Sequence, residues 1–135
     1  MVKVIMGKKG SGKTKKLIEA VNTAAKESKG NVICIEKGYV LTYDVDYQAR
    51  LIDISDYEVT NHGEMLAFLS GLLAGNYDIT DIFVDSILKV CGPDLDALGE
   101  MLGKLSQMSD KANVQVTLTV SADPSAAPES VVKYQ

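Results

Sequence analysis

Glycine, lysine and threonine residues near the start of the chain follow the spacing of a phosphate-binding loop, the Walker A pattern. Residues 7–14 read GKKGSGKT, with glycines at the first, fourth and sixth positions and Lys-Thr at the end. Glycines allow successive backbone N–H groups to turn toward one anion. A lysine adds positive charge for phosphate oxygens, and a threonine hydroxyl can bind Mg²⁺. The pattern predicts a site for nucleotide phosphates.

The segments on either side of this loop fit the same prediction. Residues 2–6 form an apolar β-type run, and residues 15–29 have helical spacing that ends at Gly30. A helix that begins in the loop directs its positive N-terminus at the bound anion. A chance glycine-rich turn is the alternative, and the flanking strand and helix disfavour it. The candidate nucleotide-binding residues are Gly7, Lys9, Gly10, Ser11, Gly12, Lys13 and Thr14.

Within that set, Lys13 is also a catalytic candidate, because its charge can act on the β- and γ-phosphates. Lys8 and Lys9 can contact phosphate or simply be solvated residues of the loop, and the second interpretation is favoured. Lysines crowd the first sixteen residues of the chain. A local positive field in an otherwise acidic chain suits a small polyanion such as a nucleotide.

The second candidate part of the site is an acidic residue at the end of another apolar run. Residues 79–84 are apolar for most of their length and Asp85 follows them directly. Parallel strands that are buried on both faces have this composition. An acid at the carboxyl end of such a strand can hold Mg²⁺ directly or through water. Many strands end in aspartate only for turn chemistry, but together with the loop this one predicts a Walker B aspartate. Thr14 and Asp85 are therefore the candidate metal-binding residues.

The positioning elements are five apolar β-type runs that alternate with helical segments. We expect strands at residues 2–6, 31–36, 50–54, 79–84 and 114–121. We expect helices at residues 15–29, from a cap at Asn61 and Glu64 to Gly75, and from Pro93 and Asp94 onward. This alternation predicts an α/β three-layer sandwich with a mostly parallel five-stranded sheet in a P-loop NTPase topology. Ligands then bind at the carboxyl ends of the strands.

Residues 37–48 do not follow either pattern. Tyr39, Tyr43 and Tyr47 stand four apart, with acidic residues between them. We interpret this segment as a loop or short hairpin whose tyrosines are ordinary, partly buried surface aromatics. One face of a helix and a nucleobase-stacking site are the alternatives.

Composition limits the class of protein. The chain has 135 residues, of which 46% are hydrophobic and 24% charged, which predicts a single globular domain over residues 1–135. The net charge of −4 disfavours direct nucleic-acid binding. No apolar run reaches the ~18–20 residues of a membrane span, and no signal-peptide pattern is evident. Cys34 and Cys91 lack CxxC spacing, which favours free, buried thiols and a cytoplasmic location. His62, the one histidine, has no partner at metal-ligand spacing.

The order of these parts resembles the core of RecA-type ATPases. Val84-Asp85-Ser86 is similar to the Walker B strand of that family, in which Asp-Ser is usual, and residues 32–36 are a strand that ends in glutamate. The resemblance implies that Glu36 is the general base for the attacking water. It also implies a polar sensor at the end of the fifth strand, on Thr119 or Ser121. The DNA-binding and oligomerisation segments of RecA have no room here, so recombination is not implied.

A thymidine-kinase-like core is a weaker match, because this chain lacks an acid after Asp85 and a zinc lobe. From the residues alone, Glu36 has an alternative role as a solvated strand-end acid paired with Lys37. Arg50 is the single arginine of the chain, so no arginine finger is evident. A protein partner or a second copy of the chain could supply one in trans.

Together these observations predict an ATP-binding P-loop NTPase that hydrolyses ATP slowly with Mg²⁺. Lys13 would hold the phosphates, Thr14 and Asp85 would hold Mg²⁺, and Glu36 would activate water. No guanine-recognition motif is present, so ATP is favoured over GTP. Two alternatives remain: a nucleotide-sensing binding module with negligible turnover, and a small-molecule kinase on the same scaffold.

Overall fold

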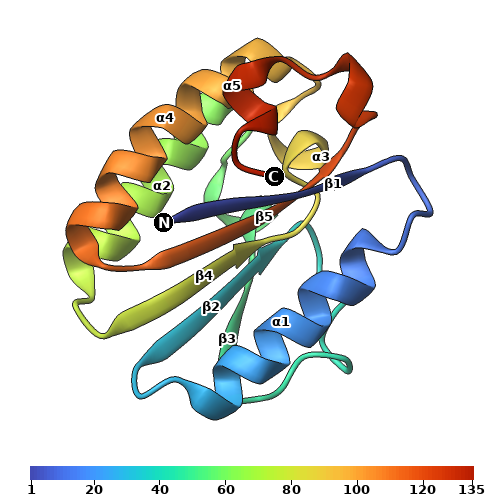
Figure 1. Ribbon diagram of the computed structural model, residues 1–135. Coiled ribbons are helices and arrows are strands. Elements are labelled where there is room, and N and C mark those ends of the chain that lie inside the picture. The colour runs from blue at the N-terminus through green and yellow to red at the C-terminus, as the bar shows by residue number, and fades with distance from the viewer.

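A computed structural model describes residues 1–135, and its helices and strands alternate along the chain (Figure 1). The order is β1 (Val2–Gly7), α1 (Lys13–Glu27), β2 (Asn31–Glu36), β3 (Ala49–Asp53), α2 (His62–Gly75), β4 (Ile79–Val84), α3 (Ile87–Cys91), α4 (Leu95–Ala112), β5 (Gln115–Ser121) and α5 (Glu129–Val132). Two 3-10 turns, Ile54–Tyr57 and Pro124–Ala126, complete it.

All five strands form one sheet in the order β1-β5-β4-β2-β3, and every neighbouring pair is parallel. The expected mostly parallel sheet is thus entirely parallel. Ile35 pairs with Val84, and Val84 pairs with Leu118. The residues that follow these three, Glu36, Asp85 and Thr119, therefore come together at the carboxyl edge of the sheet.

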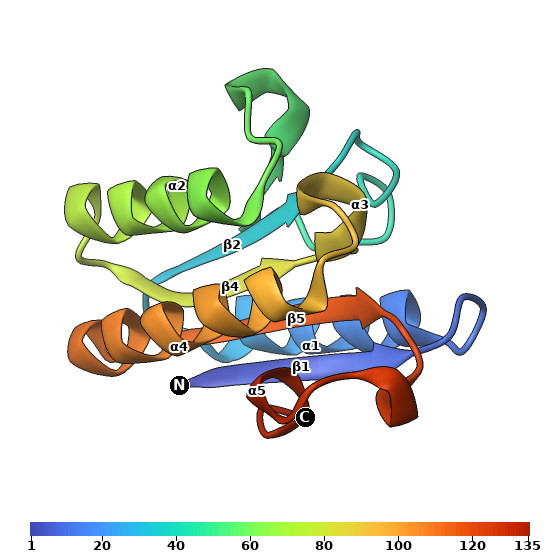
Figure 2. The same ribbon diagram turned by 90° about the horizontal axis from the view of Figure 1, so that it is seen from above.

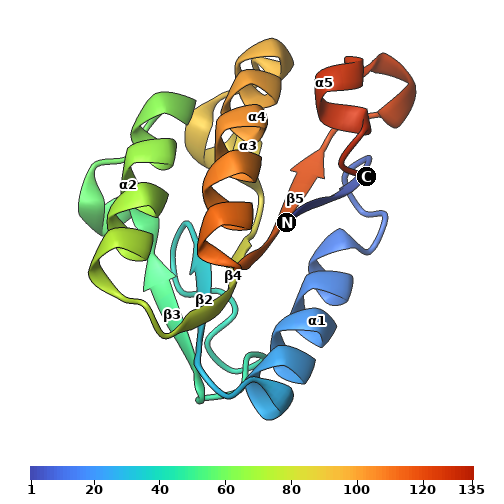
Figure 3. The same cartoon turned by 60° about the vertical axis from the view of Figure 1, so that its left-hand side comes forward.

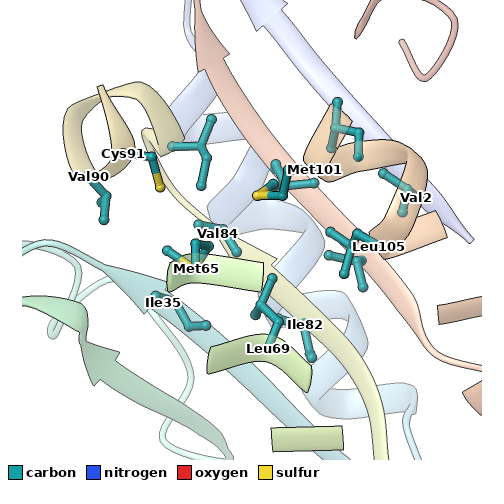
Figure 4. Close-up of a cluster of buried hydrophobic side chains, with 14 of the residues drawn as sticks. Val2, Ile35, Met65, Leu69, Ile82, Val84, Val90, Cys91, Met101 and Leu105 are labelled. Carbon is teal, nitrogen blue, oxygen red and sulfur yellow. The ribbon is translucent and has the colours of Figure 1, made fainter. Parts of the chain in front are cut away.

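Helices cover both faces of the sheet, so the three-layer α/β sandwich is confirmed. Helix α1 lies on one face, and α2 and α4 lie on the other (Figures 2 and 3). Alternate residues of a strand point to opposite faces. In β4, Ile82 and Val84 therefore enter the larger core with α2 and α4, while Phe83 enters the smaller core under α1. Figure 4 shows part of the larger core, including Met65, Leu69 and Met101.

The helix boundaries follow from local capping. Asn61 precedes α2, and its side chain accepts a hydrogen bond from Glu64 N at 2.8 Å. The Glu64 carboxylate returns to Thr60 N at 2.8 Å, one residue before the cap. Asp94 caps α4 in the same way, by accepting from Asp96 N and Ala97 N. The predicted starts of both helices are confirmed.

The structure adds features that periodicity missed. Helices α3 and α5, of 5 and 4 residues, were not expected. Residues 37–48 contain turns and no strand, so the segment is a loop and not a hairpin. Tyr43 and Tyr47 are almost fully exposed, at 99% and 91%, and not partly buried.

Both cysteines are free and buried, as expected. Burial is the main reason that the pKa of each thiol rises to about 12, so neither Cys34 nor Cys91 is a ready nucleophile. No helix of the chain has both the length and the apolar character needed to span a bilayer.

Candidate functional site

The predicted phosphate-binding loop joins the end of β1 to the start of α1. Gly10 and Gly12 both have φ of 84°, a left-handed conformation that side chains with a Cβ rarely adopt. Gly12 directly precedes α1, and no side chain caps the helix there. The first N–H groups of a helix have no partners within it. This end of α1 is therefore suited to an anion.

Gly7 permits the loop to return close to its own start. A Cβ at this position would lie 3.2 Å from Ser11 Cβ and still closer to the Ser11 hydroxyl. Lys13 is only 8% exposed, and its Nζ donates to Lys8 O at 2.9 Å and to Ser11 Oγ at 3.4 Å. The ammonium group thus lies over the loop backbone, and not in bulk solvent.

A cleft of about 640 Å³ opens in front of the loop. Its volume falls within the ~300–1,000 Å³ of small-molecule sites. Four of its ten lining residues are lysines, and Leu88 is its one hydrophobic member. The lining residues are Lys9, Gly10, Gly12, Lys13, Thr14, Lys15, Ser86, Leu88, Lys89 and Ser121. Such a polar, cationic lining suits a phosphorylated ligand better than an apolar one.

Asp85 is the point at which the loop and the sheet meet. Thr14 Oγ1 donates to Asp85 Oδ1 at 3.3 Å, although the two residues are 71 positions apart. Thr119 Oγ1 donates to the same oxygen at 2.9 Å, and Ser86 Oγ donates to Asp85 Oδ2 at 3.3 Å. The two candidate metal-binding residues, Thr14 and Asp85, are therefore adjacent.

The two sensor candidates occupy different places. Thr119 is 1% exposed, bonds to Asp85 and accepts from Ser86 N at 2.6 Å. Ser121 lines the cleft beside the loop. Both lie on the α1 side of the sheet, because they alternate along β5 with Val120, which enters the other core. Of the two, only Thr119 forms a hydrogen bond with Asp85.

Sequence reasoning missed two residues of this region, Ser86 and Lys89. Ser86 has φ of 56° and ψ of 58°, a conformation that is costly for a non-glycine residue. The positive φ turns the chain sharply from β4 into α3, which brings Lys89 to the cleft. The only signal available was the Asp-Ser pair itself, because α3 is too short to show a helical period.

The donor set at Thr14 and Asp85 fits Mg²⁺. A hydroxyl and a carboxylate supply the oxygen ligands that this hard cation prefers. No group of three or more His, Cys, Asp and Glu side chains converges anywhere in the chain. Mg²⁺ usually binds to one or two carboxylates and completes its coordination with water and substrate phosphates. The pair could therefore hold Mg²⁺ together with a nucleotide.

Glu36 lies beside Asp85 but is held by the loop after β2. It is 3% exposed, and its two carboxylate oxygens accept from Val40 N at 3.2 Å and Leu41 N at 2.9 Å. It is neither solvated nor paired with Lys37, so that alternative interpretation is wrong. Burial raises the Glu36 pKa, the two backbone bonds partly offset this, and nearby negative charge adds to it.

Glu36 also borders a second, smaller cavity of about 140 Å³. Thr14 and Asp85 line the same cavity, and so do Lys37 and Lys89. Thr14 and Lys89 also belong to the large cleft, so the two cavities share walls. Glu36 therefore lies in a cavity that adjoins the cleft in front of the loop.

The remaining polar candidates line neither cavity. His62 begins α2, on the opposite face of the sheet, and its Nε2 is buried without a hydrogen-bond partner. Burial is the main reason that its pKa is lowered, which favours the neutral imidazole. Lys8 is exposed and forms an ion pair with Asp123 at 3.5 Å. Tyr39, Tyr43 and Tyr47 line neither cavity.

Comparisons with known proteins identify the fold. No protein-family model matches the chain, and neither does any curated protein sequence. Among solved structures, a KaiC-like protein from the hyperthermophilic archaeon Pyrococcus horikoshii is similar, with a TM-score of 0.67 and 15% sequence identity. The match covers 98% of this chain and 68% of that one. The fold is therefore the RecA-like α/β fold that the order of elements predicted.

Proposed function

We propose that this protein binds ATP together with Mg²⁺ and hydrolyses it slowly. The observation that carries the proposal is the hydrogen bond from Thr14 to Asp85 at the wall of the cationic cleft. It joins a loop with two left-handed glycines to an acid that directly follows β4, which is separated from β1 in the sheet by β5 alone. A site for a phosphate chain and its metal needs these two parts in contact.

The roles of the loop residues follow from their positions. The N–H groups at the start of α1 bind phosphate oxygens, and Gly10 and Gly12 allow the backbone to curve around them. Lys13 is already over the loop, so a small change of its side chain takes its ammonium from Lys8 O to the β- and γ-phosphates. When bound, Mg²⁺ offsets the negative charge of the phosphates. Thr14 and Asp85 orient it.

Glu36 is the candidate that would accept a proton from the attacking water. Its raised pKa and its place beside Asp85 suit a general base. Both Glu36 oxygens already accept backbone N–H bonds. If the side chain stays in place, the remaining lone pairs of these oxygens are the ones that can accept the proton of the water.

The two backbone bonds that Glu36 accepts favour a second candidate function, a nucleotide-sensing module with negligible turnover. In that case Glu36 serves only to hold residues 40 and 41, and nucleotide binding changes the surface without hydrolysis. The missing arginine finger also favours low turnover, since such a group contributes ~10³–10⁵ in rate where it is present.

A phosphate-release assay separates the two functions. We expect Mg-ATP turnover well below the ~10 s⁻¹ of a median enzyme, no release without Mg²⁺, and less release from GTP. Lys13→Ala should abolish the activity. Lys26→Ala, an exposed lysine near the other end of α1, is the matched control and should match wild type. Binding without phosphate release would favour the sensing module, and fast release would refute slow hydrolysis.

A further inference from the structure

One cation stands at the boundary between the two cavities. Lys89 lines the large cleft in front of the loop and also the small cavity that contains Glu36. If the phosphates of a nucleotide lie in the cleft and the attacked bond faces Glu36, the terminal phosphate lies where the two cavities share walls. Lys89 is the only lysine that lines both.

The backbone that carries Lys89 is fixed. In α3, Ile87 is fully buried, and Val90 and Cys91 are each only 7% exposed. Figure 4 shows Val90 and Cys91 in the same cluster of buried side chains as Val84 of β4. Lys89 N also donates to Ser86 O at 3.0 Å. The Lys89 backbone therefore has a fixed position relative to Asp85, and only its side chain is free to move.

The ammonium group of Lys89 has no carboxylate partner. The two ion pairs of the structure join the N-terminus to Asp110 and Lys8 to Asp123. Lys13, in contrast, is held by Lys8 O and Ser11 Oγ. An exposed, unpaired lysine at the edge of an anion-binding cleft can contact a phosphate without first breaking an ion pair.

We propose that Lys89 contacts the terminal phosphate of a bound nucleoside triphosphate, and so makes the site prefer a triphosphate to a diphosphate. This inference rests on the proposed function. It supplies, within the chain itself, a cation near the transferred phosphate, where the sequence offers no arginine. The contact is made by a point charge on a fixed helix, and it is lost when the terminal phosphate leaves.

The test compares the dissociation constants of a non-hydrolysable Mg-ATP analogue and of Mg-ADP, measured by calorimetry. We expect Lys89→Ala to weaken analogue binding about tenfold, as for one charge-assisted hydrogen bond, and to leave ADP binding almost unchanged. Lys89→Arg should retain the preference for the triphosphate. Lys104→Ala, which removes an exposed lysine of α4 that lines neither cavity, should behave as wild type.

The outcomes are distinguishable. Equal losses for the analogue and ADP, or no loss for either, would overturn the role of Lys89 while wild-type binding still supports the proposed function. Wild-type protein that binds neither nucleotide would overturn both proposals. The melting temperature of each variant without nucleotide checks that the fold is intact, which we expect because the Lys89 side chain is exposed. The Lys89 effect should also shrink as ionic strength rises.

Discussion

Asp85 is the residue on which the candidate site depends. Its carboxylate accepts hydrogen bonds from Thr14, Thr119 and Ser86, which come from the loop, β5 and the start of α3. If it also helps to hold Mg²⁺, its charge matters more to the metal complex than to the nucleotide alone. A metal-binding role and a purely structural role therefore predict different effects of a substitution at Asp85.

We predict that Asp85→Asn weakens Mg-nucleotide binding by about tenfold to a hundredfold, a range typical of changes close to a metal. The amide can still accept from Thr14 or Thr119, but it lacks the negative charge. Nucleotide binding in EDTA should change much less. Titration calorimetry with and without Mg²⁺ measures both. Equal losses in the two conditions would mean that Asp85 acts only through its hydrogen bonds.

The pKa of Glu36 makes a prediction about stability and pH. Burial is the main cause that raises it above the ordinary value of 4.5. The folded state therefore holds the Glu36 proton more tightly than the unfolded state does. That contribution to stability is fully present below the unfolded pKa and is lost as pH rises through the folded pKa.

Glu36→Gln cannot titrate and lacks this contribution. We therefore expect the stability of wild type relative to Glu36→Gln to fall as pH rises above the ordinary glutamate pKa of 4.5. Urea unfolding of both proteins on both sides of that pH measures it, and the paired comparison cancels the other titrating groups. A difference that stays constant, or that grows with pH, would show that the Glu36 pKa is not raised.

At the scale of elements, the C-terminal segment closes the edge of the sheet at β1. Val4 N of β1 donates to Tyr134 O at 2.8 Å, and Val131 of α5 is fully buried. Helix α5 packs on α4 where Gly99 leaves room. A Cβ on Gly99 would lie 2.7 Å from Ser130 Cβ and closer still to its hydroxyl. The absence of a side chain at Gly99 is therefore a packing requirement.

Gly99→Ala should destabilise the protein by about 1–3 kcal/mol, because the added methyl group overpacks the contact between α4 and α5. Gly103→Ala is the matched control in the same helix, since nothing lies within 4 Å of a Cβ there. It should stabilise the protein by about 0.5–1 kcal/mol through helix propensity. Chemical denaturation measures both changes. Equal effects of the two substitutions would mean that α5 moves to accommodate the added methyl group without a loss of stability.

Elements with a clear period could be predicted from the sequence, and short ones could not. The strands at residues 31–36 and 79–84 have the expected bounds, and the stripe of Leu98, Leu102 and Leu105 is buried in the core. Helix α3 has too few residues to show a period. Because α3 was not predicted, Lys89 was not recognised as a site residue. The sequence gives no indication of where a lysine outside a predicted element points.

At the scale of the whole molecule, the strand order sets where Thr119 and Ser121 lie. Because β5 lies between β1 and β4, Thr119 contacts Asp85 and Ser121 lines the cleft. Either residue fitted the pattern of the sequence. The contacts of Glu36 were equally hidden, since they depend on how residues 37–48 fold back over the strand end. The loop at residues 7–14 could be recognised because its motif is local.

The account as a whole depends on nucleotide binding, and a ligand-induced shift in melting temperature tests it most directly. A ligand that binds only the folded state at a hundredfold excess over its dissociation constant adds ~2.7 kcal/mol of stability. We expect Mg-ATP and Mg-ADP to raise the melting temperature of wild type and of Lys26→Ala. The shift should be almost absent in Lys13→Ala, whose unliganded fold is kept. No shift of wild type with any nucleotide at millimolar concentration would contradict the account.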